Sequence, residues 1–156
     1  MIDQSKARLA LGCVMVVVCV GVALAQQTAT PPSEEDQAHA IGCMRTINTA
    51  EEAYAGTYDK GFSPSLTALA EVEGKAPTAS AAGLIDTSLG SGKRNGYIYE
   101  YHAGTKNAQG QIKTYTVTAR PMKWQKGAQS LFTDQTAVLR WTKENRAATV
   151  KDPPIE

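Results

Sequence analysis

The sequence has few of the residues that most often bind metals or cofactors. Only two of its 156 residues are histidines, His39 and His102, and they stand far apart in the chain. A structural or catalytic zinc site takes three or four protein ligands, so this pair by itself predicts no metal site and no cofactor. We expect both imidazoles to be exposed, His39 in the first turns of a helix and His102 at the end of a strand.

Sequence motifs of enzymes are also lacking. No serine lies in a G-x-S-x-G pattern, no C-x-x-C pair occurs, and Ser91-Gly92-Lys93 lacks the preceding glycines of a phosphate-binding loop. The acidic pairs Glu34-Glu35 and Glu51-Glu52 are adjacent in sequence, so their carboxylates point to different faces of a helix. We therefore predict no catalytic residues and a protein that is not an enzyme.

No excess of charge of one sign points to a polyanionic or polycationic partner. Lys and Arg together number 16 and Asp and Glu 15, which gives a formal net charge of +1. A DNA-binding domain of this size normally carries a basic stripe. The basic residues here form only short groups, Lys93-Arg94 and the pair Lys123 and Lys126, which are typical of solvated loops. We expect no nucleic-acid partner.

The first 25 residues differ from the rest of the chain. Residues 1–8 are polar and basic, and residues 9–25 form an uncharged apolar run that ends in Ala-Leu-Ala. A basic start, an apolar middle and a small-x-small end are the three parts of a secretory signal peptide. Ala23 and Ala25 supply the small side chains, so we predict cleavage between Ala25 and Gln26. The mature protein would then be periplasmic or extracellular.

Two other interpretations of this leader remain open. The apolar run could be retained as an inner-membrane anchor, because its 17 residues lie at the lower limit for spanning a bilayer. Alternatively Cys13 or Cys19 could be lipidated, although neither lies in a good lipobox. Cleavage after Ala25 would remove both of these cysteines and leave Cys43 alone. A single cysteine forms no internal disulfide, so we expect a half-buried apolar Cys43, with an intermolecular bridge as the alternative.

A long amphipathic helix is predicted over residues 33–57, after a polar linker at 26–32 that ends in Pro31-Pro32. Ser33 is a good N-cap, and acidic residues in the first turn suit the positive end of the helix dipole. Apolar residues recur at steps of three and four: Ile41, Met44, Ile47, Ala50, Tyr54 and Tyr58. Polar residues are expected on the other faces: Gln37, Arg45, Asn48, Glu51 and Glu52.

The remainder of the chain predicts short helices followed by strands. Ser63-Pro64 resembles an N-cap with proline at the first helical position, and another helical turn is expected at 84–89. From Tyr97 the pattern alternates with a period of two, which favours strands at 97–102 and 111–120. A tight hairpin is expected over residues 131–141.

The predicted fold class is α+β, with a long N-terminal helix packed on a roughly four-stranded antiparallel sheet in a domain of residues 33–142. The charged tail, 143–156, is expected to be flexible. Tyr97, Tyr99 and Tyr101 share one face of a strand. We expect the helix to cover them, with an exposed aromatic binding platform as the alternative, and Trp124 is a weaker candidate for a contact surface.

Five blocks of this sequence, in this order, resemble the globular heads of type IV pilins and pseudopilins, in particular pilin-like proteins of acidobacterial type. The blocks are RTINTAEEAY (45–54), GFSPSLTAL (61–69), LIDTSLGSG (84–92), GYIYEY (96–101) and FTDQTAVLR (132–140). The match covers roughly residues 38–141. The resemblance implies a ladle-shaped structural protein that assembles with other proteins and performs no chemistry.

The sequence departs from the pilin pattern at its N-terminus. The nearest counterpart of a prepilin cleavage site is Gly12-Cys13, and Val17 stands where a pilin carries glutamate. The prolines at 31 and 32 also separate the apolar run from the head helix, since proline disrupts a helix interior. The resulting hypothesis is an exported structural or interaction protein without the usual filament-forming helix. Its partners would be proteins outside the cytoplasm, such as pilin or secretion-system subunits.

Two alternative functions remain open. The chain could be a membrane-anchored minor pilin or pseudopilin of a pilus or a type II secretion machine, if the apolar leader is retained. It could instead be a small extracytoplasmic ligand-binding module. That function requires a concave pocket with convergent polar groups.

Overall fold

A computed structural model describes residues 32–155, which form an α+β fold. The elements in chain order are α1 (Glu34–Tyr58), α2 (Leu66–Leu69), α3 (Thr87–Gly90), β1 (Lys93–Arg94), β2 (Tyr97–Ala103), β3 (Tyr115–Pro121), β4 (Ser130–Asp134) and β5 (Arg140–Thr142). The five strands form one sheet in the order β1-β2-β3-β4-β5, and every neighbouring pair is antiparallel. The sheet has one strand more than expected, because the two-residue β1 pairs with the start of β2.

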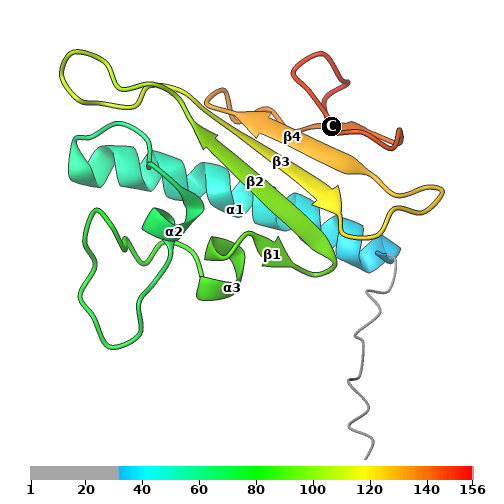
Figure 1. Ribbon diagram of the computed structural model, residues 1–156, viewed down its shortest axis with the longest axis horizontal. Coiled ribbons are helices and arrows are strands. Elements are labelled where there is room, and N and C mark those ends of the chain that lie inside the picture. The colour runs from blue at the N-terminus through cyan, green and yellow to red at the C-terminus, as the bar shows by residue number, and fades with distance from the viewer. Residues whose placement is uncertain (1–31, 156) are drawn as a thin grey trace, which may run out of the picture.

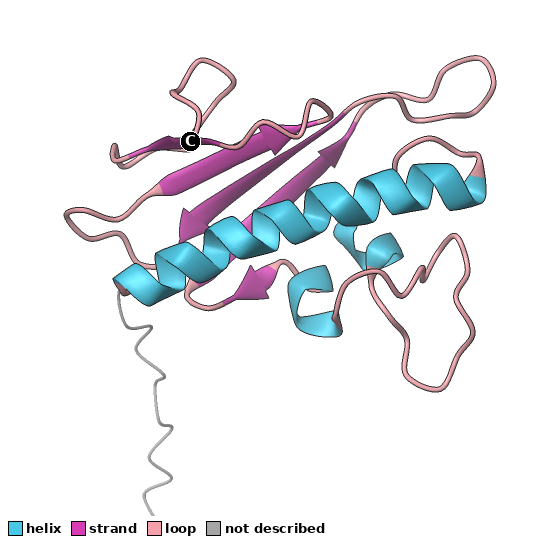
Figure 2. Ribbon diagram, turned by 180° about the vertical axis from the view of Figure 1, so that it is seen from behind, coloured by secondary structure: helices cyan, strands magenta, loops and turns pink. Residues whose placement is uncertain are grey.

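The helix α1 crosses one face of the sheet, and the short helices α2 and α3 lie beside it (Figures 1 and 2). Buried side chains from α1 and from the facing side of β2 and β3 form the core. They include Met44, Ile47, Tyr54, Tyr97, Tyr99, Tyr115 and Val117. Tyr97 is 0% exposed and Tyr99 4%, so the tyrosine row is covered as predicted and is no open platform. Each well-buried large side chain contributes roughly 1.5–3 kcal/mol.

The helix α1 begins at a well-defined cap. The Ser33 hydroxyl accepts a hydrogen bond from the backbone N–H of Asp36, and the Asp36 carboxylate accepts one from the Ser33 N–H at 2.8 Å. The capping box is therefore complete with aspartate in place of the more usual glutamate. Directly before the cap, the Pro32 side chain is fully buried and its carbonyl accepts a hydrogen bond from the Gln125 amide. The start of α1 is thus fixed to the rest of the head.

Two local predictions are wrong in detail. Ser65, and not Ser63, is the N-cap of α2, because the Ser63 side chain is directed to α1 instead. The β4–β5 hairpin is also not tight. β5 starts only at Arg140, and Ala137 in the loop has a φ of 59°. The loop lengthens because the carbonyl of Ala137 turns inward and accepts a hydrogen bond from the side-chain amide of Asn48 in α1.

The C-terminal segment was expected to be flexible, and it instead folds back along β5. The N–H of Trp141 donates to the carbonyl of Pro153 at 3.1 Å, and the N–H of Ile155 donates to the carbonyl of Leu139 at 2.8 Å. Proline has no N–H, so residues 153 and 154 cover the edge of the sheet without offering donors to another strand.

An ion pair closes the turn that leads into this segment. The Arg146 guanidinium donates to both carboxylate oxygens of Asp152, whose side chain is mostly buried. Asp152 also accepts a hydrogen bond from the backbone N–H of Thr149 at 2.7 Å. Hydrogen bonds from Arg146 lower the pKa of Asp152. The charged composition that suggested a frayed tail therefore supplies the contacts that order it.

The leader lies outside the described residues. This applies to the predicted cleavage residues Ala23, Ala25 and Gln26 and to most of the linker. Among residues 32–155, no helix combines the length and the apolar character needed to cross a membrane.

Candidate functional site

A groove of about 420 Å³ opens at the C-terminal end of α1. Its apolar lining comes from Tyr54, Phe62, Pro64, Ala79 and Ile112, and its polar lining from Lys60, Thr78, Ser80, Lys106 and Gly110. These residues belong to three segments that are distant in sequence: the end of α1 with the loop after it, the loop between α2 and α3, and the loop between β2 and β3. A volume of this size falls within the range of small-ligand pockets.

Backbone hydrogen bonds hold one side of the groove together. The N–H of Phe62 donates to the carbonyl of Ile112 at 2.8 Å, and the N–H of Ile112 donates to the carbonyl of Lys60 at 3.0 Å. Gly61 lies between them with a φ of +68°, and a Cβ there would stand 2.0 Å from the Ile112 oxygen. Only glycine permits this approach, so the loop after α1 and the β2–β3 loop form one rigid wall. The edge of the Phe62 ring packs on Tyr115 with ring centroids 4.8 Å apart.

The opposite wall is a tight turn at residues 78–81. Thr78 and Ala81 exchange backbone hydrogen bonds in both directions, at 2.9 and 3.0 Å. The hydroxyl of Tyr54, on α1, donates to the carbonyl of Ala79 at 2.7 Å and fixes the turn to the helix. Burial raises the pKa of Tyr54, so the hydroxyl remains a donor at neutral pH.

The charged side chains that line the groove are both lysines, Lys60 and Lys106. Both are exposed. The three ion pairs among the described residues involve Arg94 and Arg146, and neither of these lysines takes part in them. Asp59 is the neighbouring acidic residue in sequence, and it does not line the groove. The groove therefore combines an apolar floor with a positively charged rim.

A buried polar cluster lies near the groove at Glu51 of α1. Glu51 is 0% exposed and accepts hydrogen bonds from the Ser63 hydroxyl at 2.6 Å and the Ser63 N–H at 2.8 Å. The Tyr101 hydroxyl donates to the Ser63 carbonyl at 2.8 Å. Burial raises the pKa of Glu51, an effect that the hydrogen bonds from Ser63 oppose. Burial, together with the Glu51 charge, also raises the pKa of Tyr101.

This Glu51 cluster joins α1, the loop before α2, and β2. Its serine and carboxylate have no solvent access in the structure, since Glu51 and Ser63 are each 0% exposed. The arrangement therefore anchors the loop that carries Phe62 and Pro64, two lining residues of the groove.

Neither the groove nor the Glu51 cluster is predicted from the sequence. Glu51 and Asn48 are expected on the exposed faces of the helix, but both are buried. Asn48 accepts a hydrogen bond from the Tyr115 hydroxyl at 3.0 Å. Glu51 stands four positions after Ile47 and three before Tyr54, so its spacing places it on the buried stripe. That spacing was the signal that could have identified it.

The structure does not bring the sequence-derived candidates together. His39 and His102 are both exposed, as predicted, on α1 and β2. Within residues 32–155, no three His, Cys, Asp or Glu side chains are grouped as a metal site would require. Cys43 is buried in the core at 8% exposure.

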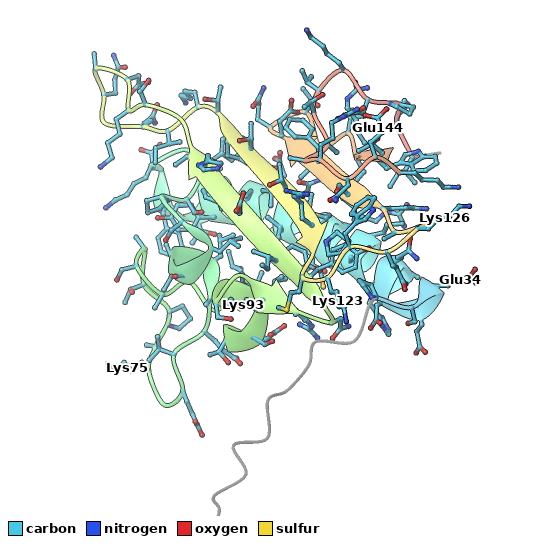
Figure 3. All side chains as sticks on the ribbon, turned by 45° about the vertical axis from the view of Figure 1, so that its right-hand side comes forward. Glu34, Lys75, Lys93, Lys123, Lys126 and Glu144 are labelled. Carbon is cyan, nitrogen blue, oxygen red and sulfur yellow. The ribbon has the colours of Figure 1, made fainter. Side chains whose placement is uncertain are left out.

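Trp124 is half-buried in the β3–β4 loop, near the start of α1. Lys123 and Lys126 of the same loop project at that end of the molecule, whereas Lys75 projects from the loop between α2 and α3 (Figure 3). The Trp124 loop is therefore separate from the groove.

No protein-family model matches this sequence, and neither the curated proteins nor the solved structures contain a significant match.

Proposed function

We propose that this chain is an exported, non-enzymatic structural or interaction protein built on a pilin-like head. The five sequence blocks that resemble pilin heads supply the helix α1, the short helices α2 and α3, strand β2 and the β4–β5 hairpin. A helix lying across an antiparallel sheet is the arrangement that this resemblance implies. The leader, with its Ala-x-Ala end before Gln26, supports export.

The observation that carries the proposal is the start of α1. A filament-forming pilin requires one helix that runs from the apolar segment into the head. Here the head helix starts at Glu34, behind a complete capping box at Ser33 and a buried Pro32. Proline at 32 and the extended backbone of Ser33 do not continue a helix. We therefore propose that the head is used outside the cytoplasm without polymerising through the usual helix.

Cell fractionation tests this proposal. The native host is separated into cytoplasm, membrane pellet, soluble exported fraction and sheared surface filaments, and the protein is followed with an antibody to the head. The proposal requires the protein in the soluble exported fraction. Recovery in sheared filaments would contradict the proposal, and recovery in the cytoplasm would contradict export altogether.

A membrane-tethered accessory subunit of a pilus or secretion machine is the second candidate. The observation that favours it is geometric. The described chain begins at one end of α1 and the groove lies at the other, and a helix of 25 residues is about 37 Å long. A head anchored by a retained leader would present the groove away from the membrane. Recovery of the protein in the membrane pellet would favour this candidate over the first.

A further inference from the structure

We infer that the groove at the C-terminal end of α1 binds a small monocarboxylate that carries an apolar body, such as a medium-chain fatty acid. This inference goes beyond the proposed function, because it assigns a ligand class to a specific site and does not depend on export. Its basis is the combination of three features of the groove. The floor is apolar, the rim carries only positive charge, and hydrogen bonds, including those of the buried Glu51, hold the walls.

The floor selects an apolar body. Tyr54 and Ile112 are almost fully buried, whereas Phe62 is half-buried and Pro64 exposed. An apolar ligand that covers the Phe62 ring and Pro64 removes surface from water without separating buried polar groups. Each methylene buried in this way strengthens binding about fourfold.

The rim selects a negative charge. Lys60 and Lys106 both line the groove. The segment of Lys60 and the segment of Lys106 pair with the Ile112 backbone on its two sides. No acidic residue lines the groove, so a carboxylate at the rim meets two ammonium groups and no like charge. A cationic ligand of equal apolar area would be repelled. The Thr78 and Ser80 hydroxyls of the opposite wall provide neutral polar partners.

The walls of the groove are held by contacts within the chain. Gly61 holds the two lysine-bearing loops together, the Tyr54 hydroxyl fixes the turn at Ala79, and Glu51 anchors the loop of Phe62. A preformed site loses less conformational entropy on binding than a flexible loop does. The size favours a small molecule, since about 420 Å³ accommodates one short apolar chain rather than a folded partner.

The test uses the protein purified from its host in its native form and follows binding by isothermal titration calorimetry and by NMR shifts. Decanoate is the principal ligand. Hexanoate and octanoate vary the apolar length, decanol removes the charge, decyltrimethylammonium reverses it, and acetate removes the apolar body. We expect saturable binding of decanoate, an increase of about fourfold per methylene up to the length that fills the groove, and weaker binding of the other three compounds.

Four variants assign the binding to the groove. Lys60→Gln and Lys106→Gln should each weaken decanoate about two- to fivefold, as expected for exposed ion pairs, and should leave decanol unchanged. Lys113→Gln is the matched control, because Lys113 is an exposed lysine on the same loop as Ile112 and does not line the groove. Ser80→Trp fills the groove from its exposed wall and should abolish binding while circular dichroism shows an intact fold.

Three results would overturn the inference. The first is equal affinity for decanoate and decanol. The second is an equal response of Lys60→Gln, Lys106→Gln and Lys113→Gln. The third is binding of a peptide with a free apolar C-terminus at least tenfold more tightly than decanoate, which would make a polypeptide the occupant. Each of these leaves the export proposal standing, because fractionation and not ligand binding decides it.

Discussion

At the scale of single residues, the most informative side chain is Glu51. Helical periodicity assigns polar residues to solvent, yet Glu51 is 0% exposed and holds the backbone and side chain of Ser63. A buried carboxylate is tolerated when its oxygens accept good hydrogen bonds. The adjacent residue, Glu52, is exposed and has the same chemistry, so the pair allows a matched comparison.

Removal of the Glu51 carboxylate should destabilise the fold. Glu51→Ala leaves the buried N–H of Ser63 without its acceptor and removes one acceptor of the Ser63 hydroxyl, and an unsatisfied buried donor costs about 1–3 kcal/mol. Glu52→Ala should change the free energy of unfolding by no more than about 0.5 kcal/mol. Urea denaturation at pH 7 measures both. Equal effects of the two substitutions would show that Glu51 is not the anchor described above.

The protonation of Glu51 should make stability depend on pH. Burial raises the pKa of Glu51 above its ordinary value of 4.5, so the folded state holds its proton more tightly than the unfolded state does. The contribution of this group is therefore full below about pH 4.5 and is lost as the pH rises through the folded pKa. Wild type should lose stability relative to Glu51→Gln over that interval. Parallel stability curves for the two proteins from pH 4 upward would contradict the assigned pKa shift.

At the scale of elements, helix α1 and the cores of β2 and β3 could be predicted because their signals are local. Apolar spacing and the Ser33 cap locate the helix within one residue at each end, and alternation locates Tyr97 to Ala103. The predicted strand at 111–120 is shorter in the structure and starts at Tyr115. Ile112 does not belong to this strand, because its backbone forms hydrogen bonds with the loop after α1. No local pattern encodes that long-range contact.

The cap at Ser33 should stabilise α1 measurably. Ser33→Ala removes the acceptor for the Asp36 N–H and one partner of the capping box, and such substitutions cost about 1 kcal/mol. Thr105→Ala, in the exposed β2–β3 loop, is the control and should have little effect. The midpoint of thermal unfolding by circular dichroism gives the comparison. An unchanged midpoint in Ser33→Ala would mean that the helix does not depend on this start.

The prediction of a flexible segment after β5 is wrong. Charged residues and prolines indicate disorder when each is considered alone, whereas here they contact one another and the sheet edge. In the structure Arg146 and Asp152 pair, and the two prolines lie along the sheet edge. The pairing lowers the pKa of Asp152, so its stabilisation is present above the ordinary carboxyl pKa of 3.8 and is lost as the pH falls through the folded pKa.

Asp152→Asn should therefore release this segment at neutral pH. Hydrogen exchange of the Trp141 and Ile155 amides should become faster, because these two N–H groups hold the segment that follows Asp152 against β5. The Trp141 N–H donates to the Pro153 carbonyl and the Ile155 N–H to the Leu139 carbonyl. Lys151→Gln is the control, since Lys151 is exposed and adjacent. If the two variants exchange at the same rate as wild type, the ion pair does not hold the edge closed.

At the scale of the whole molecule, the α+β class follows from the order of helical and alternating patterns, whereas the groove does not. Its lining comes from the end of α1, the α2–α3 loop and the β2–β3 loop, and these meet only after the helix has packed on the sheet. Lys60 and Lys106 are ordinary loop lysines in the sequence. Long-range contacts with Ile112, from Gly61 and from the backbones of Lys60 and Phe62, bring their segments together.

The start of α1 is the feature of the whole molecule on which the proposed function rests. Pro32 is buried and Ser33 caps the helix, and this is the basis for proposing a head that does not form filaments through the usual helix.

The intact mass of the native protein, purified from its host by an antibody to the head, tests this account most directly. The account predicts a chain that begins at Gln26. A chain that begins at Cys13, as cleavage after Gly12 would produce, or one that retains the complete leader, would contradict it.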